Sequence, residues 1–173
     1  MLRDFRKPLI LMTPKSTLRH KNNTSSLDQF VNGSTFHRVL SDRISKDLKN
    51  KIDRIILCSG KIYFDILEKR NSEKLSDIYI LRIEQLYPFP EKSLSEELKR
   101  FSNADFVWCQ EEPKNQGAWS YISTLIVDEL VKLSMKHQYL EYSGRVPSAS
   151  PATGLAQQHK EEQERLIKTA LGI

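Results

Sequence analysis

Short apolar runs alternate along this chain with stretches whose apolar positions repeat every three or four residues. The apolar runs are residues 8–12 (PLILM), Arg54–Cys58 (RIILC), Ile78–Ile83 (IYILRI) and residues 106–110 (FVWCQ). Continuous apolar runs of this length are typical of strands that are buried on both faces of a sheet. We predict a strand at each of these four runs and a fifth strand at residues 139–142.

Helical spacing follows most of the predicted strands. Ser93 and Glu96 have the spacing of a capping box, which would start one of the helices. Residues 27–40 fit neither period clearly. The apolar positions that predict the helices are Ile62, Ile66 and Leu67 in a helix that runs to Arg70; Leu94, Leu98 and Phe101; Trp119, Ile122, Leu125, Ile126, Leu130 and Leu133; and a terminal helix over residues 155–171.

This order of elements predicts an α/β fold with a mainly parallel five-stranded sheet and helices on both faces. A length of 173 residues suits a single domain over residues 1–173. The carboxyl ends of parallel strands meet at one edge of the sheet, where binding sites lie beside helix N-termini. Polar segments gather at that predicted edge: residues 59–61, 85–87, 111–117 and 143–145.

Composition narrows the class of protein. Hydrophobic residues make up 39% and charged residues 28%, which is ordinary for a globular domain. No run approaches the ~20 apolar residues that cross a bilayer, and residues 9–12 are too short for a signal peptide. Cys58 and Cys109 each lie inside an apolar run, so we expect two reduced core thiols in an intracellular setting.

The net charge of +5 is concentrated near the start of the chain. A basic arm of this kind can bind phosphates or an acidic protein surface, or it can be a solvated strand end. The absence of interleaved aromatic residues does not favour nucleic-acid binding. The six basic residues of the arm are Arg3, Arg6, Lys7, Lys15, Arg19 and Lys21, against the single acid Asp4.

The stretch FVWCQEEPKNQGAW combines an apolar strand, two adjacent carboxylates, a proline and a glycine before a helical pattern. Glu111 and Glu112 could act as a general acid/base pair, since neighbouring carboxylates can split their pKa values. They could equally stabilise a helix start or face a partner. The β-to-α corner predicted from Pro113 and Gly117 favours the second interpretation.

Other catalytic motifs are missing from the sequence. Ser59 and Lys61 flank a glycine at a predicted helix start, which is either a modest anion site or an ordinary turn. The remaining signature of a nucleotide-binding phosphate loop is absent, as are GxGxxG and GxSxG. The four histidines stand far apart, without the spacing of a zinc site.

Five strings in this order resemble one known family: TPKSTLRHK, CSGKIYFDILEKR, LRIEQLYPFP, VWCQEEPKNQGAW and YSGRVPSASPATG. The chain is similar over nearly its whole length to the C-terminal domain of 2-oxoglutarate dehydrogenase, the thiamine-diphosphate-dependent, decarboxylating component of its complex. The departures are small. Val146 stands where the family has proline, and residues 16–18 read STL instead of SLL or SML.

The resemblance implies a transketolase C-terminal-like fold that supports and dimerises catalytic domains. The parent enzyme oxidatively decarboxylates 2-oxoglutarate in the tricarboxylic acid cycle and passes succinyl to lipoamide on a partner succinyltransferase. Thiamine diphosphate and Mg²⁺ are cofactors of that parent, and we expect none in this chain, no catalytic residue in it and no turnover by it alone. The expected location is the bacterial cytoplasm, or the mitochondrial matrix in a eukaryote.

The resemblance also suggests two groups of site residues. Some relatives bind an adenine nucleotide or acetyl coenzyme A in this domain, and an isolated module of this kind could also serve only as a docking or sensing surface. The regulatory candidates are Arg38, Ser59, Lys61 and Arg145; the candidates for a domain interface are Gln110, Glu111, Glu112, Asn115 and Gln116.

Overall fold

The structure is a computed structural model that describes residues 4–42 and 51–173. The chain divides into two compact units, residues 1–34 and residues 35–173. The prediction that residues 1–173 make one domain stays a prediction, and each unit is described by itself.

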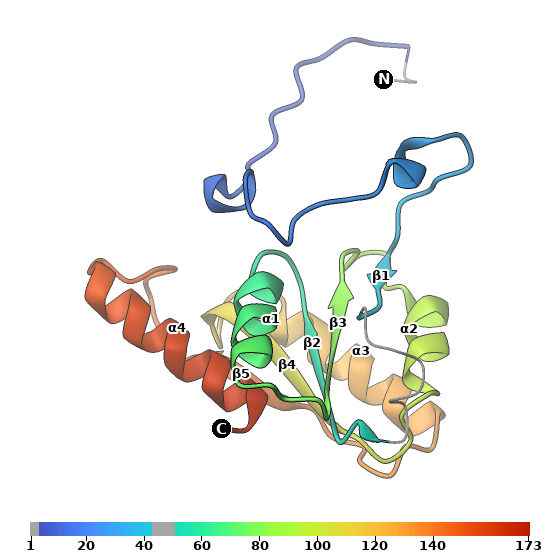
Figure 1. Cartoon of the computed structure of the whole chain (residues 1–173), viewed down its shortest axis with the longest axis vertical. Coiled ribbons are helices and arrows are strands. Elements are labelled where there is room, and N and C mark those ends of the chain that lie inside the picture. Colours follow the sequence, from blue (N-terminus) through green and yellow to red (C-terminus); the bar gives the residue numbers. More distant parts are fainter. Residues whose placement is uncertain (1–3, 43–50) are drawn as a thin grey trace. The chain divides into compact units, whose positions relative to one another are not determined.

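Residues 35–173 form a five-stranded sheet in the order β1-β3-β2-β4-β5 (Figure 1). Strand β2 pairs in parallel with β3 and β4, and β4 pairs in parallel with β5. Only β1, at one edge, is antiparallel to its neighbour β3 among the described strands. The strands are β1 (Val39–Leu40), β2 (Arg54–Cys58), β3 (Ile78–Ile83), β4 (Asp105–Pro113) and β5 (Glu141–Arg145).

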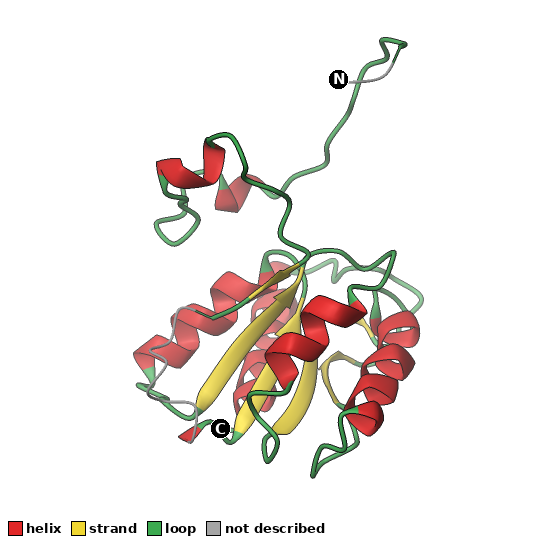
Figure 2. Ribbon diagram, turned by 90° about the vertical axis from the view of Figure 1, so that its right-hand side faces the viewer, coloured by secondary structure: helices red, strands yellow, loops and turns green. Residues whose placement is uncertain are grey.

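Helices cover both faces of this sheet (Figure 2). Helices α2 (Glu91–Leu98) and α3 (Trp119–Lys132) pack on one face, where Ile55, Leu57 and Trp108 point. Helices α1 (Ile62–Ser72) and α4 (Ala156–Leu171) pack on the other face, where Ile56 and Cys109 point. Successive strand residues thus bury against different helices, which explains why β2 is apolar at every core position. The predicted fold class is confirmed.

The prediction of a strand at residues 8–12 is wrong. Residues 8–12 are not in a strand, and no backbone hydrogen bond joins Leu9–Met12 to another residue within residues 4–34. The fifth strand is β1, from the stretch 27–40 that fitted no period, where residues 27–30 form a 3-10 helix instead. An apolar run becomes a strand only where another strand satisfies its backbone, and sequence alone does not supply that partner.

Three element boundaries also differ from prediction. Helix α2 begins at Glu91 after Pro90 and has no side-chain cap, so Ser93 and Glu96 do not form a capping box. Strand β4 continues past Gln110 to Pro113, with a register shift against β5. Strand β5 runs over Glu141–Arg145 instead of 139–142. The predicted terminal helix is confirmed at Ala156–Leu171.

Residues 1–34 contain two 3-10 turns, Lys15–Thr17 and Leu27–Phe30, which are held by local hydrogen bonds. The basic residues of this arm are exposed, except that Arg3 lies outside the described residues. No helix in the described part of the chain is long and apolar enough to cross a membrane.

Candidate functional site at the carboxyl edge of the sheet

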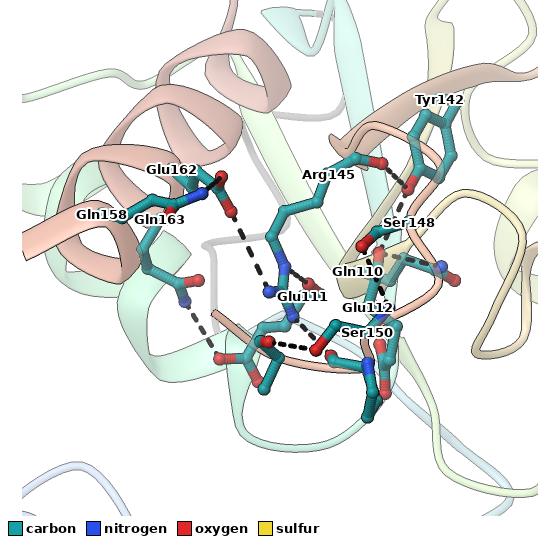
Figure 3. A network of polar contacts seen from close by, with 12 residues as sticks. Gln110, Glu111, Glu112, Tyr142, Arg145, Ser148, Ser150, Gln158, Glu162 and Gln163 are labelled. Carbon is teal, nitrogen blue, oxygen red and sulfur yellow. Dashed lines mark hydrogen bonds and ion pairs between the residues drawn. The ribbon is translucent and has the colours of Figure 1, made fainter. Parts of the chain in front are cut away.

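Three segments meet where the parallel strands β2, β4 and β5 end. Ser59 and Lys61 follow β2, the corner 110–117 follows from β4, and Arg145 ends β5. Figure 3 shows side chains from β4, β5 and α4 converging around Glu111 and Arg145. We call the following residues the edge cluster: Ser59, Lys61, residues 110–117 and Arg145, together with Asp65 from α1 and Gln163 from α4.

Gln110 organises the corner from inside. Its side chain is buried, and its Oε1 accepts hydrogen bonds from Trp108 Nε1 at 2.9 Å and from the Trp119 backbone N–H at 3.0 Å. Its Nε2 donates to the carbonyls of Gln116 at 2.8 Å and Pro113 at 3.2 Å. The side-chain amide of Gln110 therefore forms hydrogen bonds with backbone groups at both ends of the turn that joins β4 to α3.

Two glycines allow the backbone to approach this corner closely. Gly117 has φ +66°, and a Cβ there would lie 3.0 Å from both Gln110 Nε2 and Glu112 Cβ. A Cβ on Gly144 would lie 2.3 Å from the hydroxyl oxygen of Tyr142. Both glycines are therefore required by the packing of the corner.

Tyr142 ties β5 to the corner. Its hydroxyl donates to the carbonyl of Arg145 at 2.9 Å or to that of Glu112 at 3.2 Å. Burial raises the pKa of Tyr142 to about 12. The phenol stays protonated at neutral pH and acts as a hydrogen-bond donor.

Glu111 is the charged centre of the edge cluster. Its carboxylate forms an ion pair with Lys61 and accepts a hydrogen bond from Gln163 Nε2 at 3.1 Å. Gln163 Nε2 also lies 2.8 Å from Asp65 Oδ2. The cluster therefore links α1, β4 and α4 through side chains that already have partners.

Arg145 packs against the other side of the same backbone. Its Nε donates to the carbonyl of Glu111 at 2.5 Å, and an Nη donates to the carbonyl of Pro151 at 3.0 Å. Glu162 on α4 lies 3.9 Å from its remaining Nη. Arg145 therefore connects β5, the loop after it and the terminal helix.

The two carboxylates of the corner have different surroundings. Glu111 and Glu112 are consecutive residues near the end of β4, where the register against β5 shifts. Glu111 is paired with Lys61, whereas Glu112 is exposed. The first turn of α3 contains no acidic residue, so neither carboxylate lies in that turn. Glu111 instead pairs with Lys61, the residue before α1.

Asn115 and Gln116 fasten the loop that follows β5. Asn115 Nδ2 and Gln116 Nε2 donate to the carbonyl of Ser148 at 3.0 and 2.9 Å, and the Ser148 N–H donates to Asn115 Oδ1 at 3.0 Å. Sequence reasoning missed Ser148 because it lies in a loop of small residues without periodic signal. It also missed Gln163, which belongs to the polar face of α4.

Arg38 is not brought together with Lys61 and Arg145. It is exposed, and it lines a hollow of about 400 Å³ with residues at the start of α2, among them Lys92 and Ser93. Its carbonyl accepts hydrogen bonds from the backbones of Glu84 at 2.9 Å and Gln85 at 3.1 Å. Because β1 and β2 are separated by β3, about 10 Å of sheet lies between Arg38 and Ser59.

The thiols and carboxylates of this edge offer no metal site. Within residues 4–42 and 51–173 there is no group of three His, Cys, Asp or Glu side chains that could hold a metal ion. Burial raises the pKa of the Cys109 thiol to about 12 and that of the Cys58 thiol well above its usual value. Both thiols are therefore protonated core residues, as their apolar surroundings in the sequence predict.

Comparison with known proteins gives a consistent result. The sequence model of a family described as 2-oxoglutarate dehydrogenase C-terminal matches residues 24–171. Proteins named 2-oxoglutarate dehydrogenase E1 component are 50% identical over 182 residues in Brucella anthropi, 51% over 180 in Brucella abortus and 50% over 182 in Brucella ovis. Each match covers 99% of this chain but only 18% of the relative, so the chain spans less than a fifth of their length.

Proposed function

Because the chain belongs to the family of 2-oxoglutarate dehydrogenase C-terminal domains, we propose that it supports and dimerises the catalytic domains of such an enzyme. The parent is an oxidoreductase that decarboxylates 2-oxoglutarate in the tricarboxylic acid cycle and transfers succinyl to lipoamide. Its partners are the remaining dehydrogenase domains, a second copy in a homodimer and the lipoyl-bearing succinyltransferase. We place it in the bacterial cytoplasm, or in the mitochondrial matrix if the source is a eukaryote.

One observation carries this proposal: half of the residues are identical to a named dehydrogenase component over 99% of the chain. The matched region covers the strands, the helices and the loops of the edge cluster. A domain that had left the enzyme for another role would need to keep only its core positions. The extent of the match therefore supports service within the dehydrogenase.

Thiamine diphosphate and Mg²⁺ are the cofactors that we assign to the parent. The diphosphate cofactor supplies carbanion chemistry when bound. The described residues do not fit this group, since they include no cluster for a metal and the carboxylate of Glu111 is already paired with Lys61. We therefore assign the cofactor and the catalytic residues to other parts of the parent.

The corner 110–117 is the surface that we assign to contacts with neighbouring domains. Gln110 acts indirectly, by holding the corner in shape, and Glu111 and Gln116 are half-buried beside it. Glu112 and Asn115 are exposed, and Asn115 is held in place by its hydrogen bonds with Ser148. A polar, rigid corner suits the rim of a domain interface.

A chimaera tests the proposal. This chain would replace the corresponding 18% of the Brucella anthropi enzyme. We expect the chimaera to dimerise and to transfer succinyl from 2-oxoglutarate to lipoamide, whereas the 173-residue chain alone shows no turnover. An inactive chimaera, or activity of the chain alone, would contradict the proposal.

A matched pair of variants examines the corner itself. Glu112→Arg reverses an exposed charge on the corner, and Glu96→Arg reverses an exposed charge on α2. We expect only the first to weaken dimerisation or activity of the chimaera. Equal effects of the two variants in sedimentation and turnover would argue against an interface at the corner.

Our second proposal is a regulatory role for four residues: Arg38, Ser59, Lys61 and Arg145. With this role, the chain could also serve as a stand-alone sensing module. What supports it is their position along one sheet edge, where a ligand as long as a nucleotide or acyl coenzyme A could span the separation. Lys61 would have to exchange its ion pair with Glu111 for a phosphate. We expect millimolar AMP or acetyl coenzyme A to raise the melting temperature of the chimaera, and Arg38→Ala with Lys61→Ala to abolish the shift.

A further inference from the structure

The chain contains only two cysteines, and the fold places them side by side. Cys58 is the last residue of β2 and pairs in register with Cys109 of the parallel strand β4. Both side chains belong to the cluster that packs against α1 and α4, so they lie on the same face of the sheet. Two thiols that are far apart in the sequence are therefore direct neighbours in the core.

The spacing of the two strands suits a covalent bridge at this pair. Register partners on neighbouring strands have Cα atoms about 4.8 Å apart, and disulfides join Cα atoms that are about 4.4–6.8 Å apart. The Cβ atoms of a disulfide lie within about 4.5 Å of each other, so the two residues must lean together to close it. Disulfides that need such an adjustment are the readily reduced, reversible ones.

Both thiols are unreactive while this face of the sheet is covered. Cys58 and Cys109 are free and 0% exposed. Burial raises the pKa of Cys58 well above its usual value, and the neighbouring Cys109 raises it further. Because the thiolate is the reactive form, the pair reacts only when water and a base reach the sulfur atoms.

Helix α4 is the cover that opens most readily. It has four buried residues among 16, whereas α1 has five among 11, and elements with few buried contacts open at low free energy. The Ser143 hydroxyl fastens α4 to β5 by donating to the Leu166 carbonyl at 2.6 Å. The residues of α4 that share the cluster with the two thiols are Leu166, Ile167, Ala170 and Leu171.

We propose that Cys58 and Cys109 form a reversible disulfide between β2 and β4 under hydrogen peroxide, with the opening of α4 as the gate. One thiolate attacks the peroxide, the O–O bond breaks, and a sulfenic acid remains. The second thiolate attacks that sulfur, so the S–S bond forms and the S–O bond breaks. In sum, two thiols are oxidised to one disulfide, and one peroxide is reduced to two waters. This inference does not depend on the proposed function.

The bridge lies directly beneath the edge cluster. Strand β2 leads from Cys58 to Lys61, and β4 leads from Cys109 to Gln110 and Glu111. A change of tilt at the two cysteines therefore acts on the Lys61–Glu111 ion pair and on the hydrogen bonds of Gln110. Oxidation of the pair thus alters the corner 110–117.

Peptide mapping of the 173-residue chain tests the bridge. The chain is treated with hydrogen peroxide in the absence of denaturant, its remaining thiols are alkylated, and it is digested with trypsin. We expect the peptides of residues 55–61 and 101–114 to be joined within a monomer, and dithiothreitol to separate them. Sulfinic or sulfonic acids at both cysteines without joined peptides, or bridges only between copies, would overturn the proposal.

A matched pair of core variants tests the gate. Leu166→Ala weakens the packing of α4, and Leu130→Ala removes an equally buried side chain from α3 on the other face. We expect the bridge to form at least about tenfold faster in Leu166→Ala than in Leu130→Ala, because only the first loosens the cover of the thiols. Equal rates would show that the bridge forms only after global unfolding, and would overturn the gate.

A milder pair of variants keeps this comparison open if either leucine variant does not fold. Ser143→Ala removes the hydrogen bond that fastens α4, whereas Thr169→Ala removes an exposed one to the Arg165 carbonyl within α4. We expect only Ser143→Ala to speed bridge formation, by about two- to fivefold. No difference between these two variants would also overturn the gate.

Hydrogen exchange of the Trp119 amide tests the effect on the corner. This amide donates to Gln110 Oε1 at 3.0 Å. We expect it to exchange at least about threefold faster in the bridged chain and to recover after reduction, whereas peroxide should not change it in Cys58→Ala. Unchanged exchange in a fully bridged chain would contradict the coupling between the thiol pair and the corner.

Discussion

Two apolar runs of nearly the same composition differ in how far their side chains are buried. In β2, the residues Ile55, Ile56, Leu57 and Cys58 are completely buried. In residues 8–12, the exposed fractions of the four apolar side chains are between 72 and 92%. Each run follows a basic residue, Lys7 in the first case and Arg54 in β2.

The difference lies in the partners that each run has within the described chain. Strand β2 has β3 on one side and β4 on the other, with helices over both faces. Within residues 4–34, the run at residues 8–12 has no strand beside it and no α-helix over it. Burial of an apolar run is therefore favourable in free energy, but the surrounding polypeptide determines whether the run is buried.

The largest expected effect comes from placing the same charge in each run. Ile56→Lys buries an ammonium between β2 and the α1/α4 face, and we expect it to cost more than about 4 kcal/mol and unfold the domain. Ile10→Lys in the 173-residue chain should change the free energy of unfolding by less than about 0.5 kcal/mol. Urea denaturation of both variants checks this, and equal costs would break the comparison.

Arg70 stabilises the domain that contains β2 through a buried ion pair. Its guanidinium pairs with Asp42, whose Oδ2 also accepts from the Ile80 backbone N–H at 2.9 Å. Arg70→Met should cost about 3–5 kcal/mol, because the buried carboxylate loses its counter-charge. The double variant Arg70→Met/Asp42→Leu should recover part of that loss. A double variant less stable than the single one would contradict this account.

Gln110 gives the next largest effect, where β4 leaves the sheet. Gln110→Ala leaves Trp108 Nε1 and the Trp119 N–H without their acceptor, and we expect a loss of about 1–3 kcal/mol. Asn115→Ala, which removes exposed hydrogen bonds to Ser148, is the matched control and should cost less. A larger loss for the control in guanidinium unfolding would shift the organising role from Gln110 to the loop.

The smallest expected effect is a fall in the free energy of unfolding at alkaline pH. The pKa of Cys109 is raised from 9.0 to about 12 by burial, so the folded chain keeps this proton while the unfolded chain releases it. The stability from this group is fully present below pH 9 and is lost as the pH rises toward 12. Between about pH 8 and about pH 10 the loss should be about 1 kcal/mol.

Cys109→Ala removes this contribution. Its constant packing cost cancels when the same variant is compared at the two pH values, so the fall in its free energy of unfolding should be smaller than that of the parent chain. An identical pH dependence in the two proteins would show that the thiol is not the group responsible. Thermal unfolding followed by circular dichroism at both pH values provides the measurement.

Most of the sheet was predictable because its signals are local. The runs at β2 and β3 and the spacing of Leu94, Leu98 and Ile122 follow from burial on a period of two or of three to four. The capping box at Ser93 failed because Pro90 starts the helix before it, and a short motif does not reveal which turn comes first. Strand β1 was missed because two residues, Val39 and Leu40, carry no periodicity.

The edge cluster was predictable only in outline. The rule that parallel strands end at one edge placed Lys61, Glu111 and Arg145 near each other, and the structure joins all three. It did not indicate that Lys61 and Glu111 pair, or that Arg38 lies at a separate hollow. Those outcomes depend on strand order and on side-chain reach, which no sequence spacing records.

The sequence by itself determined the class of the fold, the family and the residues that need burial, because periodicity, turn chemistry and specific motifs are properties of neighbouring positions. Tertiary structure alone decided which strand pairs with which, that Gln110 satisfies the corner and that Leu9–Met12 pair with no strand within residues 4–34. The physical reason is that hydrogen bonds and apolar contacts are satisfied in space. Positions far apart along the chain, or in another domain, supply the partners.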